Sequence, residues 1–370
     1  MAMNFVNTIT AQVKKHWFLL GLVFAIILAA VFPYIGKKGG WIRSEYTVSY
    51  GAIILIFFIS GLSLKSQALK DAVLYWQLII VVQVISLGIT PLIGYGVMKL
   101  LLWGSFDANL ARGFVVACAC PTTVSSNVLM TKTAGGNEAA ALTNAVIGSI
   151  LGVFLSPPLI VFMLDLKSDN GGSVDYISIL FKLFITVILP LIVGQIIRVA
   201  FPNLITNLQK KLNLAIMNST LLLILVWSVF CETFSEKDTF SNIPVLSFIV
   251  TAIISATLFC SFSLLAFYVS IIPACGFTRP DTIAIVMCGA TKTVALGIPL
   301  INVIFNGNPA LGIISIPLLV YHAEQLFIGS FMIPWFQNWV KDRKPLPAEE
   351  NNDEGNAITL NETAAIAIVN

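Results

Sequence analysis

The sequence predicts an all-α polytopic membrane protein with ten transmembrane helices, arranged as two inverted five-helix repeats. Composition is the first observation: 57% of the 370 residues are hydrophobic and 11% are charged, whereas soluble globular domains carry about 25% charged residues. The second is a series of apolar runs long enough to cross a bilayer. The third is a pair of similar polar interruptions within two of these runs, 170 residues apart.

Each apolar run approaches the roughly 20 residues that a membrane-spanning helix needs. The predicted spans are 17–33, 48–64, 73–98, 111–131, 141–164, 178–200, 212–231, 244–272, 281–305 and 311–336. The first lacks a small-residue cleavage site, which indicates a retained signal anchor. The predicted units are therefore an N-terminus (1–16), a first repeat (17–164), a second repeat (178–339) and a polar, flexible tail (340–370).

Ten spans place both termini on one side of the membrane. Twelve lysines and arginines then fall on the side of the termini and eight, including Lys38, Lys99 and Lys182, on the opposite side. Because basic loops are retained in the cytoplasm, both termini and the polar tail are predicted to be cytosolic.

Several functional classes are disfavoured. Lysines and arginines exceed acidic residues by only 21 to 18, without a dense basic cluster, so no nucleic-acid partner is predicted. The six cysteines lie in or beside apolar segments, and no C-x-x-C spacing accompanies a histidine pair, so neither a disulfide scaffold nor a structural metal is expected. Without a G-x-S-x-G elbow, a glycine-rich phosphate loop or a water-facing carboxylate pair, the chain is predicted not to be an enzyme and to need no cofactor.

The inverted repeat rests on two matches in the same order. Residues 118–127 match 288–294, and residues 151–157 match 328–334 at a similar offset of 177 residues. Units with an odd number of crossings must enter the membrane in opposite orientations. The interrupted fourth and ninth spans are then expected to break at Pro121 and Gly289 and to meet near the midplane, because polar backbone at that depth must line a cavity or be buried in protein.

Lys292 stands about eleven residues into a span of some 25, too deep to reach either interface. Burying its charge without a partner would cost at least about 3 kcal/mol. One interpretation is that the span boundaries differ from those predicted. The other is a fixed cation that faces the cavity, where it holds an anionic substrate or replaces a transported cation.

Glu324 is the other deep charge, between His322 and Gln325 in the tenth span. A pair between Lys292 and Glu324 would offset both desolvation costs. Such a pair would serve either as a proton relay or as a structural link between two helices. His322 is expected to be a hydrogen-bonded packing residue rather than a titrating switch.

Hydroxyl and amide side chains surround the interruptions and complete the predicted cavity. Hydroxyls of this kind suit a small cation or a polar substrate group, but they also join neighbouring helices in membranes. Gln83 and Ser86 in the third span are predicted to share a face toward the same cavity. The candidate cavity residues, besides those named above, are Thr122, Thr123, Ser126, Asn127, Thr143, Asn144, Thr291 and Thr293.

Four segments resemble the bile acid:sodium symporter family, in particular a divergent branch with vertebrate, fungal and bacterial members. They are residues 57–64, 135–141, 277–282 and 292–299, and the resemblance runs from about Trp17 to Trp339. It implies a panel domain of spans one, two, six and seven, and a core domain that holds crossed helices four and nine. It also implies a lipid-embedded transporter of a small molecule that works by alternating access.

In sodium-coupled relatives, as the resemblance implies, two sodium ions are bound by polar groups of the fourth, fifth and ninth spans. Ser126 and Asn127 match the fourth-span ligands of these relatives, so the resemblance implies a sodium site at these two residues. The ninth-span ligands fall instead on Cys288 and Lys292, and a third-span glutamine falls near Ser86. A lysine ammonium in a sodium position would fill it and repel the ion. We therefore expect that the protein does not use the second sodium site, and that sodium coupling is absent or replaced by protonation of Lys292.

The resemblance further implies a link to calcium homeostasis and secretory-pathway glycosylation, in the plasma membrane and/or the Golgi and endoplasmic reticulum. The leading hypothesis is a secondary transporter for a small organic solute of anionic character. One alternative is a non-transporting regulator that restrains calcium influx through a partner channel. Another is a cation/proton antiporter of the same broad architecture.

Overall fold

A computed structural model describes residues 17, 18, 20–63, 75–165, 181, 182, 184–235, 243–306 and 308–341. These residues form helices with short connections and contain no β-strand. The predicted N-terminus, 1–16, the junction between the repeats, 166–177, and all but the start of the predicted tail lie outside the described residues. The last described helix extends to Lys341, past the predicted start of the tail at residue 340.

The helices follow the predicted apolar runs. In chain order they are Leu20–Val31, α2 (Pro33–Gly36), α3 (Ser44–Tyr46), η1 (Thr47–Ala52), α4 (Ile53–Ser63), α6 (Trp76–Gln83), η2 (Val84–Ile89), α7 (Thr90–Trp103), α8 (Ala108–Ala119), α9 (Ser125–Thr133), α10 (Glu138–Leu164), η3 (Phe184–Ile188), α12 (Leu189–Ala200), α13 (Pro202–Leu212), α14 (Leu214–Ser235), α16 (Val245–Ser270), η4 (Pro273–Cys275), α17 (Arg279–Ala290), α18 (Val294–Ile304) and α19 (Leu311–Lys341).

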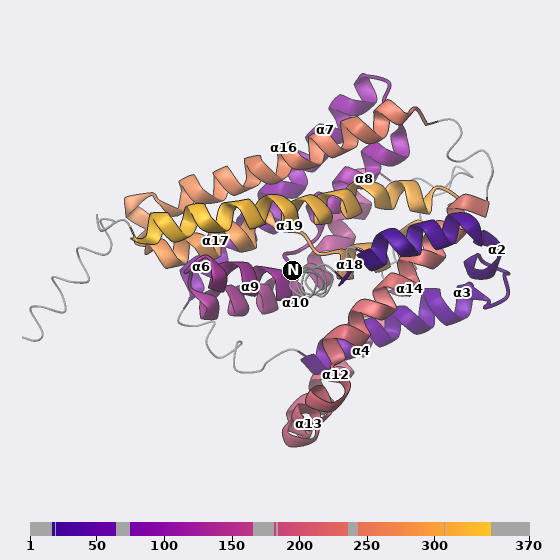
Figure 1. Cartoon of the computed structure of the whole chain (residues 1–370), viewed down its shortest axis with the longest axis horizontal. Helices are drawn as coiled ribbons and strands as arrows, with labels where there is room; N and C mark the ends of the chain where they lie inside the picture. Colours follow the sequence, from indigo (N-terminus) through magenta and orange to yellow (C-terminus); the bar gives the residue numbers. More distant parts are fainter. Residues whose placement is uncertain are drawn as a thin grey trace, which may run out of the picture.

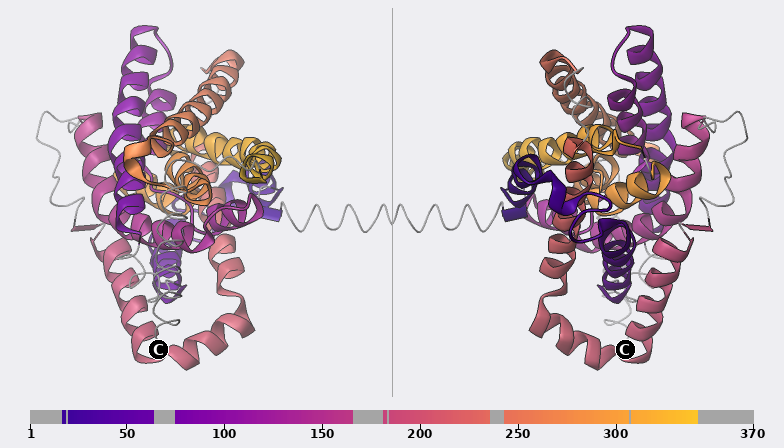
Figure 2. Two further views of the ribbon diagram at one scale, coloured as in Figure 1. Left: turned by 90° about the vertical axis from the view of Figure 1, so that its left-hand side faces the viewer. Right: turned by 90° about the vertical axis from the view of Figure 1, so that its right-hand side faces the viewer.

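Seven of these helical stretches are long and apolar enough to cross a membrane, or up to eight if a bent pair counts as one span. The bent pair is Phe184–Ala200 with Pro202–Gln209, which meet at 109°. The bend falls at Phe201, just before Pro202. A proline disfavours helical backbone angles at the residue before it, so the helix ends there. Figure 2 shows α13 at one extremity of the molecule, turned away from α12. Two predicted spans, 17–33 and 111–131, overlap the shorter apolar helices Leu20–Val31 and Ala108–Ala119, respectively.

The helices pack in two groups. In the first, α4 packs against α12 and α14, and α14 also contacts α2. In the second, α8 packs against α7 and α19, and α16 packs against α17 and α19, so that α19 runs along the long axis beside its neighbours (Figure 1). Helix α18 touches members of both groups, because it contacts η1 and α14 as well as α8 and α19.

Close approach of α4 and α12 depends on two glycines. A Cβ atom at Gly61 would overlap the Leu191 carbonyl oxygen, and one at Gly194 would overlap the Phe58 carbonyl oxygen. Small residues at such an interface let two backbones come together, and packing then replaces the hydrophobic effect that lipid does not supply. The first group is therefore held together by backbone contact along α4 and α12.

We predict that Gly61→Val lowers the free energy of unfolding by about 1–3 kcal/mol, since overpacking this contact forces the helices apart. The measurement is thermal unfolding of purified protein in detergent. Gly96→Val in α7 is the matched control, because a Cβ at Gly96 meets no atom within 4 Å. Equal melting temperatures for the two variants would contradict the role of Gly61.

Candidate functional site

Two short non-helical segments lie where the sequence places its polar interruptions. Helix α8 ends at Ala119 and α9 begins at Ser125, while α17 ends at Ala290 and α18 begins at Val294. The two segments touch, because the backbone N–H of Thr293 donates to the Pro121 carbonyl oxygen at 2.9 Å. They therefore satisfy part of each other's free backbone.

The structure corrects the predicted break at Gly289. This residue lies inside α17, whose helix continues to Ala290, and the interruption covers residues 291–293. A Cβ at this position would make ordinary van der Waals contact with Ala266 at 3.4 Å and Ile85 at 3.5 Å, so the packing does not require a glycine either. Pro121, in contrast, lies in the interruption between α8 and α9 as predicted.

Five of the candidate oxygen ligands form one hydrogen-bonded cluster around Asn127. The Asn127 Oδ1 atom accepts from the Thr291 hydroxyl at 2.6 Å and from the Thr123 hydroxyl at 3.0 Å. The Asn127 amide nitrogen donates to Thr122, whose hydroxyl lies 3.0 Å from that of Thr291. The hydroxyls of Thr123 and Ser126 are 2.5 Å apart. Side chains from both interruptions thus share one buried polar cluster.

The Lys292 side chain is fully buried and points to the third predicted span. Its Nζ atom donates to the Ser86 carbonyl oxygen at 2.6 Å, to the Thr90 hydroxyl at 2.7 Å and to the Ser86 hydroxyl at 3.1 Å. An ammonium has three donors, and three oxygen contacts surround this one. The charge is therefore buried with its hydrogen-bonding capacity met.

The Ser86 carbonyl is free to accept because of the local helix geometry. Ser86 lies in the π-helical turn η2, where the Thr90 N–H bonds to Ile85 rather than to Ser86. The next residue, Pro91, has no N–H to offer. The carbonyl oxygen of Ser86 therefore has no such backbone donor and accepts from the ammonium and the Thr90 hydroxyl instead.

Thr90 was not among the predicted site residues. Its position four residues after Ser86 and next to a proline is a signal that the sequence offers.

The backbone of Lys292 is held by the tenth predicted span. Gln325 accepts from the Lys292 N–H at 2.7 Å and donates to its carbonyl oxygen at 2.9 Å. The His322 Nδ1 atom lies 3.2 Å from the same carbonyl and 2.7 Å from the Gln325 amide. His322 and Gln325 thus form a bracket around the interruption, which agrees with a hydrogen-bonded packing histidine.

The hypothesis of a Lys292–Glu324 pair is wrong in this structure. The ammonium turns to Ser86 and Thr90, and one carboxylate oxygen of Glu324 has no hydrogen-bond partner among the described residues. The reason is helical geometry: consecutive residues lie about 100° apart around a helix, so α19 directs Gln325 at Lys292 and Glu324 elsewhere.

Helix α10 contributes the remaining candidates. Asn144 is buried and accepts from the Gln83 amide at 2.7 Å, which brings together two predicted residues. Thr143 is also buried beside it. The helix approaches the first interruption through Gly152, where a Cβ would overlap the Pro121 ring. Thr293 does not belong to the cluster around Asn127. It caps the N-terminus of α18, where its hydroxyl accepts a hydrogen bond from the Ala295 N–H at 3.2 Å.

The site therefore consists of helix ends, polar side chains and one buried cation at membrane depth. Such sites, with interrupted helices next to each other, define a class of polytopic membrane transporters. The chain belongs to the SBF-like CPA transporter family, whose profile matches residues 16–338. This match confirms the resemblance to the bile acid:sodium symporter family.

Named relatives cover nearly the whole chain. The sodium/bile acid cotransporter 7 of Rattus norvegicus is 38% identical over 337 residues, which are 90% of this chain and 96% of the relative. The Danio rerio protein of the same name is 36% identical over 334 residues, covering 90% and 97%. The solute carrier RCH1 of Candida albicans is 30% identical over 381 residues, covering 92% of each chain. All three names are those of transporters.

We predict that Thr90→Val destabilises the protein by about 1.5–3 kcal/mol, because it removes a hydrogen bond to a buried charge. In a Lys292→Met background the same substitution is expected to cost less, about 0.5–1.5 kcal/mol, because it then removes only the neutral bonds of the hydroxyl to the Ser86 and Cys118 carbonyl oxygens. Thermal or denaturant unfolding of the four proteins in the double-mutant cycle measures the coupling. Additive effects of the two substitutions would contradict the contact.

Proposed function

We propose that this protein is a secondary transporter that moves a small organic solute of anionic character by alternating access. Support comes from family membership and from relatives named as a sodium/bile acid cotransporter and a solute carrier. The polar cluster and the buried cation supply groups that bind solutes, whereas a purely structural bundle has no need of a lysine at this depth.

The observation that carries the proposal is the contact between the two interruptions. The Thr291 hydroxyl lies 2.6 Å from Asn127, 164 residues away in the chain, and the Thr293 N–H lies 2.9 Å from the Pro121 carbonyl oxygen, 172 residues away. In inverted-repeat transporters, paired breaks of this kind form the substrate site, because free helix ends expose peptide dipoles there. We place the substrate site at this crossing.

The finer architecture follows from the same proposal. Ten spans in two inverted repeats would make α8–α9 and α17–α18 the crossed, broken helices. The group of α4, α12 and α14 would correspond to the panel, and the group of α8, α16, α17 and α19 to the core. Helix α18, which contacts both groups, would then lie at the boundary where core and panel move against each other.

Lys292 would replace a sodium ion in this transporter. Its ammonium occupies a nest of oxygens at 2.6 to 3.1 Å next to Ser86, the position where the resemblance places a third-span sodium ligand. Oxygen atoms are also the ligands that hard cations prefer. Around Asn127 and Ser126, the other implied sodium site, the oxygens bond to one another, so an ion there would have to displace these hydrogen bonds.

The proposed cellular role is calcium homeostasis together with secretory-pathway glycosylation, in the plasma membrane and/or the Golgi and endoplasmic reticulum, with cytoplasmic termini. The rival, a regulator of a calcium-channel partner, would need a docking surface but not a working cavity. The two readings therefore differ in whether the buried cluster matters.

A cation/proton antiporter is the second candidate, because a fully buried lysine held only by neutral oxygens can exchange its proton for a cation. Purified protein in proteoliposomes under a pH gradient tests it. Proton flux that requires sodium, potassium or calcium would favour the antiporter, and no flux with any of these ions would exclude it.

We predict that uptake of organic anions into proteoliposomes is unchanged when sodium is replaced by potassium or choline, because the Lys292 ammonium holds the position of the second ion. Initial rates over a screen of labelled anions measure this. Anion uptake that depends steeply on sodium, with a Hill slope of two ions, would contradict the proposal that Lys292 replaces a sodium ion.

We predict that Lys292→Ala and Asn127→Ala abolish the cellular calcium phenotype while the proteins still fold and reach their membrane. Calcium uptake in cells that lack the endogenous protein is the measurement, with substitutions of exposed residues such as Lys132→Ala in α9 as controls. Loss only in the cavity variants supports transport. Retention in them, with loss in a surface variant, supports the regulator.

A further inference from the structure

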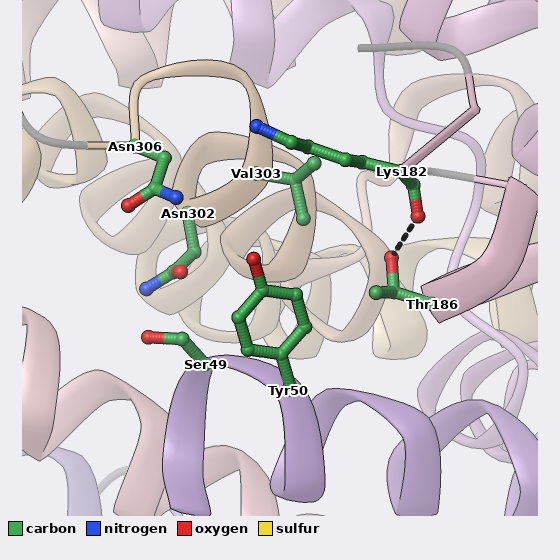
Figure 3. Close-up of a pocket in the computed structure, with 7 residues that line it drawn as sticks. All are labelled: Ser49, Tyr50, Lys182, Thr186, Asn302, Val303 and Asn306. Carbon is green, nitrogen blue, oxygen red and sulfur yellow. Dashed lines mark hydrogen bonds between the residues drawn. The ribbon is translucent and has the colours of Figure 1, made fainter. Parts of the chain in front are cut away.

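A second polar site lies away from Lys292, in a pocket between η1, η3 and α18 (Figure 3). Seven residues line it: Ser49, Tyr50, Lys182, Thr186, Asn302, Val303 and Asn306. Figure 3 shows the Lys182 side chain extending over Val303 toward Asn306, with the Tyr50 hydroxyl directed into the same space. The pocket therefore borders α18, the helix that contacts both packing groups.

Two side chains of the pocket have no hydrogen-bond partner among the described residues. Asn302 is only 5% exposed and Ser49 only 8% exposed, yet neither side chain hydrogen-bonds to any described residue. A buried amide or hydroxyl without a partner is costly, so native structures nearly always satisfy it. Asn302 in particular lines the pocket with a carboxamide that is free, among the described residues, to bind a ligand there.

The charge of the pocket is positive. Lys182 is the one charged residue among those that line it, and its ammonium forms no bond to the described part of the chain. A second ammonium stands at the rim, where Lys38 donates to Asn306 at 2.7 Å. The nearby carboxylates of Glu232 and Glu45 accept from the backbone N–H groups of Lys38 and Gly39. No carboxylate lines the pocket itself, so a cation has no counter-charge there.

The position of the pocket connects it to the crossing. Asn302 follows Thr293 by nine residues of α18, which corresponds to about 13 Å at 1.5 Å per residue. Lys38 and Lys182 both fall on the side opposite the termini in the predicted topology. A solute entering from that side would meet Lys182 before it met the cluster around Asn127.

We propose that this pocket binds the anionic group, a carboxylate, sulfate or phosphate, of the transported solute before it enters the crossing. Lys182 supplies the charge, and Asn302, Ser49 and Tyr50 supply hydrogen bonds. Charge-assisted bonds of this kind are about twice as strong as neutral ones. The inference rests on the transport function proposed above and adds a separate entrance subsite with its own residues.

The binding test uses the full-length protein in nanodiscs of neutral lipid. Potassium salts of sulfate, phosphate and acetate are titrated at constant ionic strength, and thermal unfolding is followed. Because anions that bind the folded state raise its melting temperature, we expect a saturable rise in the wild type. Lys182→Gln is expected to weaken the apparent affinity about tenfold or more, and Asn302→Ala less, whereas Lys182→Arg should retain it.

Lys99→Gln is the matched control, because it removes the same charge on the same predicted side, where Lys99 instead lies over the Tyr95 ring at 5.2 Å. A rise lost in Lys182→Gln but kept in Lys99→Gln supports the subsite. No saturable rise, or an equal rise in both variants, overturns it. Nanodiscs with added phosphatidylglycerol separate the two sources of the anionic group, since a Lys182-dependent stabilisation by that lipid alone assigns the subsite to a headgroup.

The subsite and the transport function fail in different ways. If anions bind through Lys182 while no solute is transported under any gradient, the transport proposal falls and the subsite stands. If a solute is transported and Lys182→Gln leaves its KM unchanged, the subsite falls and transport stands. A raised KM with unchanged kcat for Lys182→Gln is the result that both proposals require.

Discussion

Burial of the Lys292 ammonium is the interaction on which the central site depends. A full charge in a low-dielectric interior must find oxygen partners or lose its proton. The structure provides these partners through η2, whose π-helical turn leaves the Ser86 carbonyl free just before Pro91. The Thr90 hydroxyl completes the nest. One irregular turn, η2, therefore holds the interruption between α17 and α18 in place.

From that contact the rest of the crossing follows. Gln325 and His322 of α19 contact the backbone of Lys292, and the Thr293 N–H donates to the carbonyl oxygen of Pro121. Gly152 on α10 leaves space for Pro121 in the first interruption. Backbone groups of Pro121, Lys292 and Thr293 that the broken helices leave free thus meet protein groups, as the membrane requires. In the Lys182 pocket, by contrast, the Asn302 carboxamide has no hydrogen-bond partner among the described residues.

Particular residues show how far the sequence could be read. The depth of Lys292, the break at Pro121 and the grouping of Thr122, Asn127 and Thr291 were readable because charge and proline are conspicuous inside apolar runs. The partner of Lys292 was not readable. Choosing between Glu324 and Ser86 requires the rotation of α19 and η2 about their axes, which hydropathy leaves undetermined. Gly289 was wrongly predicted as a break because the sequence alone does not distinguish a glycine inside a helix from one that ends it.

By itself, the sequence determined that this is a polytopic membrane protein of a transporter family, because composition, run lengths and motifs are properties of the chain alone. It also determined which polar residues stand at membrane depth. Only the tertiary structure decided which residues lie together. It places Lys292 against Ser86 and Thr90, and it brings Ser49, Lys182 and Asn302 around one pocket. The physical reason is that such contacts depend on the packing angles of helices far apart in the chain.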